Sequence, residues 1–190
     1  MDYQSIMADP VDGTRIGRLY MSAPSRPDAP SVRDAYASFV RQVDWQYDLM
    51  TRPVAQGGYG ITVIPQQEDP YADAGEMFHE VATRSVLRVY RTQPEQLHPI
   101  LSADSNDRFR AVHDFFGHFQ SARGFDRHGE EAAWVRHSKM FVGSGVRAMT
   151  TETRGQSSAF IWVNGGREFP PQKALLLPEW VSTVPLKWLV

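Results

Sequence analysis

The heptapeptide VHDFFGH at residues 112–118 constrains the fold more than any other stretch of the chain. It places His113 and His118 five residues apart, with an acidic residue, two phenylalanines and Gly117 between them. In a regular α-helix, residues five apart point in directions roughly 140° apart, so both imidazoles can meet one ion only where the helix ends or distorts. Gly117 is well placed to permit such a distortion. The spacing therefore disfavours the HExxH pattern of zinc proteases, whose histidines are four apart, but leaves a metal site open.

The polar residues around this motif have the composition of a metal site with nitrogen and oxygen ligands. Four of the six histidines fall between residues 113 and 137, and the chain contains no cysteine that could supply a thiolate. Imidazole and carboxylate together suit iron, zinc, manganese or copper. The candidate ligands and their neighbours are His113, His118, His137, Asp114, Asp126, Glu130, Glu131 and Glu152.

Each candidate also has a structural interpretation. His113 and His118 can be packed polar residues at the end of a buried helix. Glu130 and His137 are seven residues apart, which places them two turns along one helical face, as site residues or as a surface pair. Glu152 lies among apolar residues, and a buried carboxylate needs a metal ion or an arginine as its partner. Arg147 and Arg154 are close enough in sequence to Glu152 to be that partner.

The runs HDFFGH (113–118) and FQSARGF (119–125), followed by Glu130 and by Glu152 within TTETRG, resemble the iron site of the pterin-dependent aromatic amino acid hydroxylases. The resemblance implies that His113 and His118 are the imidazole ligands of iron(II) and that Glu152 is the carboxylate ligand. Asp114 and Glu130 fall near acidic positions of that family. The similarity spans residues 113–152, lacks the Pro-Asp lead-in before the first histidine, and includes no pterin-binding segment, so it gives no expectation of pterin.

The expected function is that of a metal-dependent oxygenase or hydroxylase acting on a small molecule. A 2-His-1-carboxylate site leaves positions open on iron(II), as in non-haem iron oxygenases. Asp114, Glu130 and His137 are the expected catalytic residues. Asp114 would hold a ligating histidine in one tautomer, and the other two would support the ligands or face the substrate.

Two alternatives remain open from the sequence. The same ligands can hold zinc in a metallohydrolase, with Glu130 or Asp114 as the general base. The chain can also be a non-enzymatic structural or phage-assembly protein, whose histidines are packed polar residues. The metal content of the protein distinguishes these alternatives.

The periodicity of the chain predicts a single α+β domain. Apolar residues recur at helical spacing after Ser31, which predicts a helix that stops before Pro53. The segments 60–65 and 85–92 are predicted strands, with a helix over 73–84 between them and a loop over 92–107 after them. Residues 107–163 are predicted to be mostly helical in about three pieces, broken near 121–125 and 143–145.

The two ends of the chain are expected to differ from its middle. Residues 1–30 are rich in Pro, Ser, Asp and Gly, which predicts an extended N-terminal arm on a globular domain of residues 31–190. The tail contains FPPQ (169–172), LLLPEW (175–180) and VPLKWLV (184–190). These proline-interrupted apolar runs predict edge strands or a wrapping segment, and a possible contact between copies in a homo-oligomer.

Composition disfavours several classes of partner. The formal net charge is -2, so no broad basic field favours nucleic acid. No run of 18 apolar residues predicts a membrane span, and the first residues lack the features of a signal peptide. These features lead us to expect a cytoplasmic protein. Neither a phosphate-binding loop nor a G-x-S-x-G nucleophile elbow is present.

Overall fold

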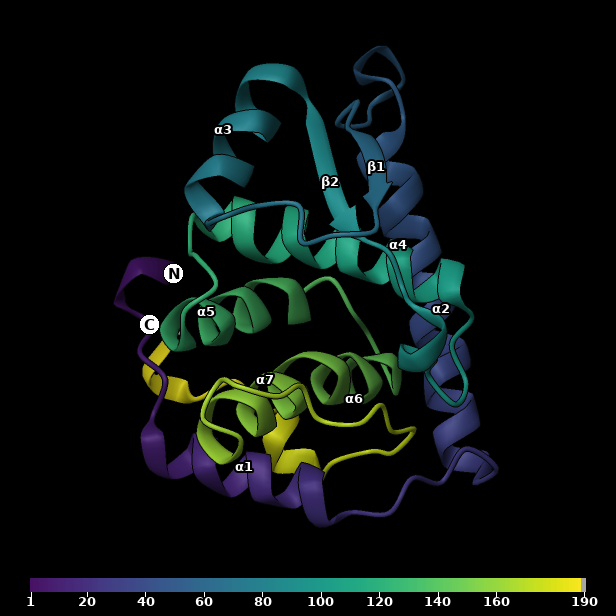
Figure 1. Ribbon diagram of the computed structural model, residues 1–190, viewed down its shortest axis with the longest axis vertical. Coiled ribbons are helices and arrows are strands. Elements are labelled where there is room, and N and C mark those ends of the chain that lie inside the picture. The colour runs from purple at the N-terminus through teal and green to yellow at the C-terminus, as the bar shows by residue number, and fades with distance from the viewer. Residues whose placement is uncertain (189–190) are drawn as a thin grey trace.

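The computed structural model describes residues 1–188, and its longest element is helix α2 (Pro30–Thr51). Pro30 occupies the first turn of α2, where its missing N–H costs nothing. The helix ends just before Pro53, because the residue that precedes a proline is disfavoured in the helical conformation. The predicted apolar stripe is buried along α2, and the helix packs against α4 and α6 (Figure 1).

The remaining elements follow in chain order. The α-helices and strands are α1 (Pro10–Ser22), β1 (Thr62–Gln66), α3 (Ala74–Arg84), β2 (Val86–Tyr90), α4 (Ala103–His113), α5 (Arg127–Ser138), α6 (Gly145–Thr150) and α7 (Gln156–Ser158). Three π-helical turns are η4 (Asp114–Phe119), η5 (Thr151–Gly155) and η6 (Ala159–Val163). Short 3-10 turns are η1 (Tyr3–Ser5), η2 (Val54–Gln56), η3 (Pro94–Gln96), η7 (Glu179–Ser182) and η8 (Leu186–Trp188).

The two strands form a small parallel sheet at one end of the molecule (Figure 1). The register runs from Thr62 opposite Val86 to Gln66 opposite Tyr90, and α3 makes the crossover that parallel strands require. Strand β2 packs against α4. These elements confirm the predicted strands and the helix between them, and the fold is α+β with helices dominant.

The predicted helical region is also confirmed in three pieces, and its first helix begins at Ala103, so the predicted loop over 92–107 is wrong for its last five residues. Helix α4 continues directly into η4, α5 follows separately, and a third helix runs from α6 through η5 and α7 to η6. The first break contains Ala122 with a φ of 54°, and the second contains Gly143 with a φ of 60°. Both residues adopt the left-handed conformation, which cannot continue a right-handed helix.

The prediction of an extended conformation for residues 1–30 is wrong for Pro10–Ser22, which form α1. Asp9 caps the helix by accepting hydrogen bonds from the backbone N–H groups of Val11 and Asp12. Ile16 and Tyr20 lie one turn apart and are both buried, in a cluster with Ala159 and the tail. Burial of this short stripe stabilises a helix that composition alone does not indicate. The division into an arm and a domain stays a prediction.

The tail wraps around the helices, and its described part, residues 164–188, contains no strand. The predicted edge strands are therefore absent there, because the prolines in this segment remove ladder donors. Instead, the Lys173 ammonium donates to the carbonyl oxygens of Tyr20, Met21 and Ala23 at the end of α1. A contact between copies through the tail stays a prediction. Within residues 1–188, no helix is both long and apolar enough for a membrane span.

We expect Gly17→Ala to destabilise the docking of α1. An added Cβ at Gly17 would lie 2.6 Å from the Ser158 carbonyl oxygen, so α1 would have to move away from α7. The free energy of unfolding, measured with urea, should fall by about 1–3 kcal/mol. Arg18→Ala, on the exposed side of the same helix, is the control and should change little. Equal stability of Gly17→Ala and wild type would contradict the close packing of α1.

Candidate metal centre

The π-helical turn η4 brings the two histidines of the motif together. In a π-helix the backbone hydrogen bonds join residues five apart, so His113 and His118 lie on one side of the turn rather than 140° apart. Their ring centroids are 5.1 Å apart, with the ring planes at 81°. The distortion that a shared ion would require is therefore present, at the place where Gly117 permits it. Such turns occur frequently at functional sites.

Gly117 allows the packing around this turn. A Cβ at Gly117 would lie 3.1 Å from Nδ1 of His113 and 3.3 Å from the Cβ of Ala133 on α5. Both distances are shorter than ordinary van der Waals contact. The absence of a side chain therefore lets α5 approach η4 with the His113 ring beside it.

The close approach of α5 places Glu130 beside the two histidines. One potential ligand atom from each of His113, His118 and Glu130 lies within 4.8 Å of the other two. Nε2 of His118 is 3.5 Å from Oε1 of Glu130. Ligand atoms bonded to a metal at about 2.1 Å, with angles of 90–110°, lie about 3.0–3.4 Å apart. The separation is thus close to that of two ligands of one ion.

The backbone holds His118 in a single tautomer. Its Nδ1 lies 3.0 Å from the carbonyl oxygen of Arg123 and 3.1 Å from that of Gly124. Carbonyl oxygens only accept hydrogen bonds, so Nδ1 carries the proton. The neutral ring then has its lone pair on Nε2, the nitrogen that faces Glu130. Carbonyl acceptors orient metal-binding histidines in the same way.

A chain of hydrogen bonds through His137 orients His113. Its Nδ1 lies 3.1 Å from Nδ1 of His137, and Nε2 of His137 lies 2.6 Å from Oε1 of Gln46. Burial and the charges of Arg136 and His118 lower the pKa of His137 to about 3. Burial, with His118 and His137 nearby, also holds the pKa of His113 well below its ordinary value. Both rings are therefore neutral at physiological pH, and neutral imidazole is the form that binds metals.

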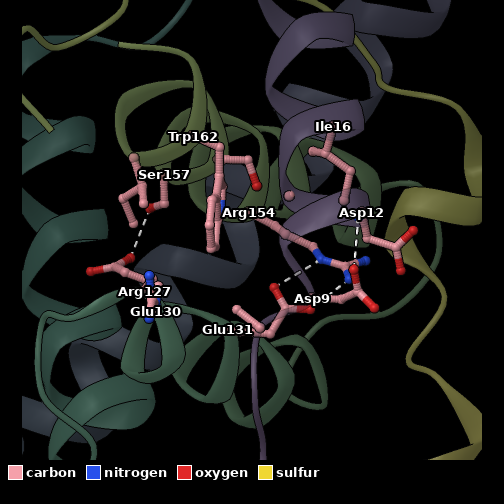
Figure 2. Close-up of a pocket in the computed structure, with 13 residues that line it drawn as sticks. Asp9, Asp12, Ile16, Arg127, Glu130, Glu131, Arg154, Ser157 and Trp162 are labelled. Atoms are coloured by element: carbon pink, nitrogen blue, oxygen red, sulfur yellow. Dashed lines mark hydrogen bonds and ion pairs between the residues drawn. The ribbon is translucent and has the colours of Figure 1, made fainter. Parts of the chain in front are cut away.

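Ser157 orients the carboxylate of Glu130. Its hydroxyl donates to Oε2 of Glu130 at 2.7 Å (Figure 2). This leaves Oε1 facing His118. Ser157 and Gln46 both support the group, yet neither was singled out from the sequence. They lie in helices far from residues 113–118 along the chain, and no motif or spacing connects them with it.

Glu152, the expected carboxylate ligand, lies in a different cluster. It accepts hydrogen bonds from the Tyr36 hydroxyl and, at 2.6 Å, from Nε2 of Gln156. Nε2 of His98 is 3.3 Å from its Oε1. The carboxylate is buried and satisfied by neutral donors, so Glu130 replaces it beside the histidines. The alternative pairing of Glu152 with an arginine is also wrong.

The arginines near Glu152 have other partners. Arg154 forms a buried two-pronged ion pair with Glu131, at 3.1 Å and 2.5 Å. Arg147 donates to the carbonyl oxygen of Leu177. The suggested surface pair of Glu130 with His137 is likewise absent, because His137 is fully buried between Gln46 and His113.

Asp114 lies beside the group but does not orient either histidine. No hydrogen bond joins its side chain to a described residue, and the tautomer role expected of it belongs to His137 and to backbone carbonyls. The pKa of Asp114 is raised to about 7, mainly by burial; His118 and Arg110 lower it, and Glu130 adds to the rise. The Asp114 carboxyl group therefore changes between its protonated and ionised forms near neutral pH.

A small cavity adjoins the group on the side of α1. Glu130 and Ser157 line it together with Gly13, Arg127 and Trp162 (Figure 2). The indole of Trp162 packs directly on α1, where a Cβ at Gly13 would lie 2.3 Å from Nε1. With a volume of about 20 Å³, the cavity has room for about one water molecule beside the Glu130 carboxylate.

Comparisons with protein-family models, with curated proteins and with solved structures found no match.

We expect the metal-free Asp114→Asn variant to be more stable than wild type, by an amount that increases as the pH rises. A carboxyl group whose pKa is raised to about 7 by folding binds more protons in the folded state between its ordinary pKa and 7. This group therefore reduces stability progressively as the pH rises through that window, and the cost is complete above 7. Asparagine resembles the protonated form and avoids this cost.

Urea unfolding at pH 5 and pH 8 measures the effect. The stabilisation by Asp114→Asn should be larger at pH 8, by about 1–3 kcal/mol, since one pKa unit is worth about 1.4 kcal/mol and water screens part of the cost. The exposed Asp28→Asn is the control and should show little change with pH. A variant that is less stable than wild type at pH 8 would contradict this assignment.

Proposed function

We propose that His113, His118 and Glu130 bind a divalent transition metal and that the protein is a non-haem iron oxygenase or hydroxylase. One observation supports this more than any other. Two imidazoles and a carboxylate converge within 4.8 Å, and Nδ1 of each histidine has a hydrogen-bond partner in the protein. Each histidine is left with Nε2 as its available nitrogen. When both Nε2 atoms are unprotonated, they and Oε1 of Glu130 are all acceptors, and a cation bound between them would stabilise the group.

The donor set favours iron or zinc over the hard cations. Calcium and magnesium take oxygen ligands, whereas imidazole nitrogen suits iron, zinc, copper and nickel. Two histidines and one carboxylate form the three-ligand face of non-haem iron(II) oxygenases. Iron(II) bound there would supply oxygen-activating redox chemistry. The HDFFGH motif that resembles the aromatic amino acid hydroxylases contributes two of these ligands, while Glu130 takes the place implied for Glu152.

The residues of this chain would perform the remaining tasks. Ser157 would hold the carboxylate of Glu130, and His137 would hold the ring of His113. Phe109 is buried with its ring centroid 5.9 Å from that of His113, and it would keep water from this side of the group. Asp114, with its pKa near 7, would donate or accept a proton beside a bound small-molecule substrate.

A zinc metallohydrolase is the second candidate. Two histidines and a glutamate are also the ligand set of hydrolytic zinc sites, which keep one position open for water. The raised pKa of Asp114 suits a general base near neutral pH. Elemental analysis of protein purified anaerobically without a histidine tag separates the two candidates, with iron indicating the oxygenase and zinc the hydrolase.

We expect Glu130→Ala to lower the affinity for iron(II) by about 100-fold or more, because a lost ligand costs at least as much as a lost outer hydrogen bond. His113→Ala and His118→Ala should do the same. Equilibrium dialysis of each purified variant under anaerobic conditions measures the affinity.

Two control variants define the specificity of this result. His79→Ala removes an exposed histidine and should bind iron(II) as wild type does. Glu152→Gln should also keep its metal affinity, because Glu152 lies in the separate cluster with Tyr36. Wild-type affinity in Glu130→Ala, together with a loss in Glu152→Gln, would overturn the ligand assignment.

A further inference from the structure

A buried hydrogen-bond chain connects helix α2 with the metal centre. Gln46 on α2 and His137 on α5 are both fully buried. Oε1 of Gln46 lies 2.6 Å from Nε2 of His137, whose Nδ1 lies 3.1 Å from Nδ1 of His113. The chain thus ends at His113, whose other nitrogen, Nε2, is the one left for the proposed ion.

The backbone determines the direction of this chain. Nε2 of Gln46 donates to the carbonyl oxygen of Met140 at 3.3 Å, so the amide oxygen points to His137. An amide oxygen only accepts, and Nε2 of His137 therefore carries a proton. In the neutral ring Nδ1 of His137 is then an acceptor, and Nδ1 of His113 must donate to it. His113 is left with its lone pair on Nε2.

No other described residue gives His137 a polar partner. Its ring is enclosed by aromatic side chains, with centroids 5.0 Å from Phe141, 6.3 Å from Phe109 and 6.4 Å from Phe116. Without the amide oxygen of Gln46, the proton of His137 could move to Nδ1. His113 would then accept at Nδ1 and carry its own proton on Nε2, which blocks a metal.

We propose that Gln46 is a positioning residue of the metal centre, which through His137 fixes His113 in the tautomer that presents an unprotonated Nε2. The link to metal binding rests on the function proposed above, whereas the tautomer itself is a property of the metal-free protein. Gln46 touches neither the ion nor a substrate.

Long-range ¹H–¹⁵N correlation spectra of the histidine rings test the proposal directly. They are recorded on the metal-free full-length protein at pH 8, where the rings are neutral. Wild type should show His113 protonated at Nδ1 and His137 protonated at Nε2. In Gln46→Leu the His113 signals should shift to the other tautomer or to a mixture. His113 protonated at Nε2 in wild type, or unchanged in Gln46→Leu, would overturn the proposal.

Two further variants separate positioning from a general loss of structure. Gln46→Glu keeps an oxygen acceptor at this position and should retain the wild-type tautomer of His113. Gln42→Leu removes a matched glutamine one turn earlier on α2, which binds the backbone of Val142 instead. It should leave the His113 spectrum unchanged. A shift in Gln42→Leu as large as that in Gln46→Leu would contradict a specific role for Gln46.

Metal affinity provides the second readout. Anaerobic titration with iron(II) should show affinity lowered about 10–100-fold in Gln46→Leu, the usual cost of losing an outer hydrogen bond. Gln46→Glu should bind within a few-fold of wild type. If wild type shows the stated tautomers but binds no metal, the proposed function fails while the positioning role stands. If wild type binds metal and Gln46→Leu binds equally well, the link between Gln46 and metal binding fails.

Discussion

The π-helical turn at Asp114–Phe119 is the constraint on which the candidate site depends. It aligns residues five apart and so brings His113 and His118 to one side of the helix. In a continuous α-helix the two side chains would point about 140° apart, so the rings could not bind one ion together. Gly117 admits α5 beside this turn, and α5 carries the carboxylate that completes the group.

Hydrogen bonds from the protein orient each of the three side chains, those of His113, His118 and Glu130. Backbone carbonyls of the loop before α5 bind His118, the chain through His137 binds His113, and Ser157 binds Glu130. A hydrogen bond to each ligand from the protein is the common pattern around metal sites in proteins. The residues that make these contacts lie partly on α2, α5 and α7. The packing of these helices therefore determines the geometry of the group.

The sequence predicts elements well where one periodicity dominates, as in α2 and the parallel strands, and poorly at the two ends. Helix α1 depends on burying Ile16 and Tyr20 against the third helix, which local pattern does not reveal. The spacing of the histidine pair shows that the helix must distort if both bind one ion, and Gly117 indicates where. The carboxylate beside the histidines cannot be identified in this way, because Glu130 and Glu152 both lie on predicted helices and only tertiary packing shows which of them faces η4.

Anomalous X-ray scattering from crystals of the protein loaded with iron(II) tests the central claim most directly. The account predicts one strong peak at the iron edge, within about 2.0–2.2 Å of a nitrogen from each of His113 and His118 and of an oxygen from Glu130. A peak centred on Glu152, or no peak at the two histidines in stoichiometrically loaded protein, would contradict it.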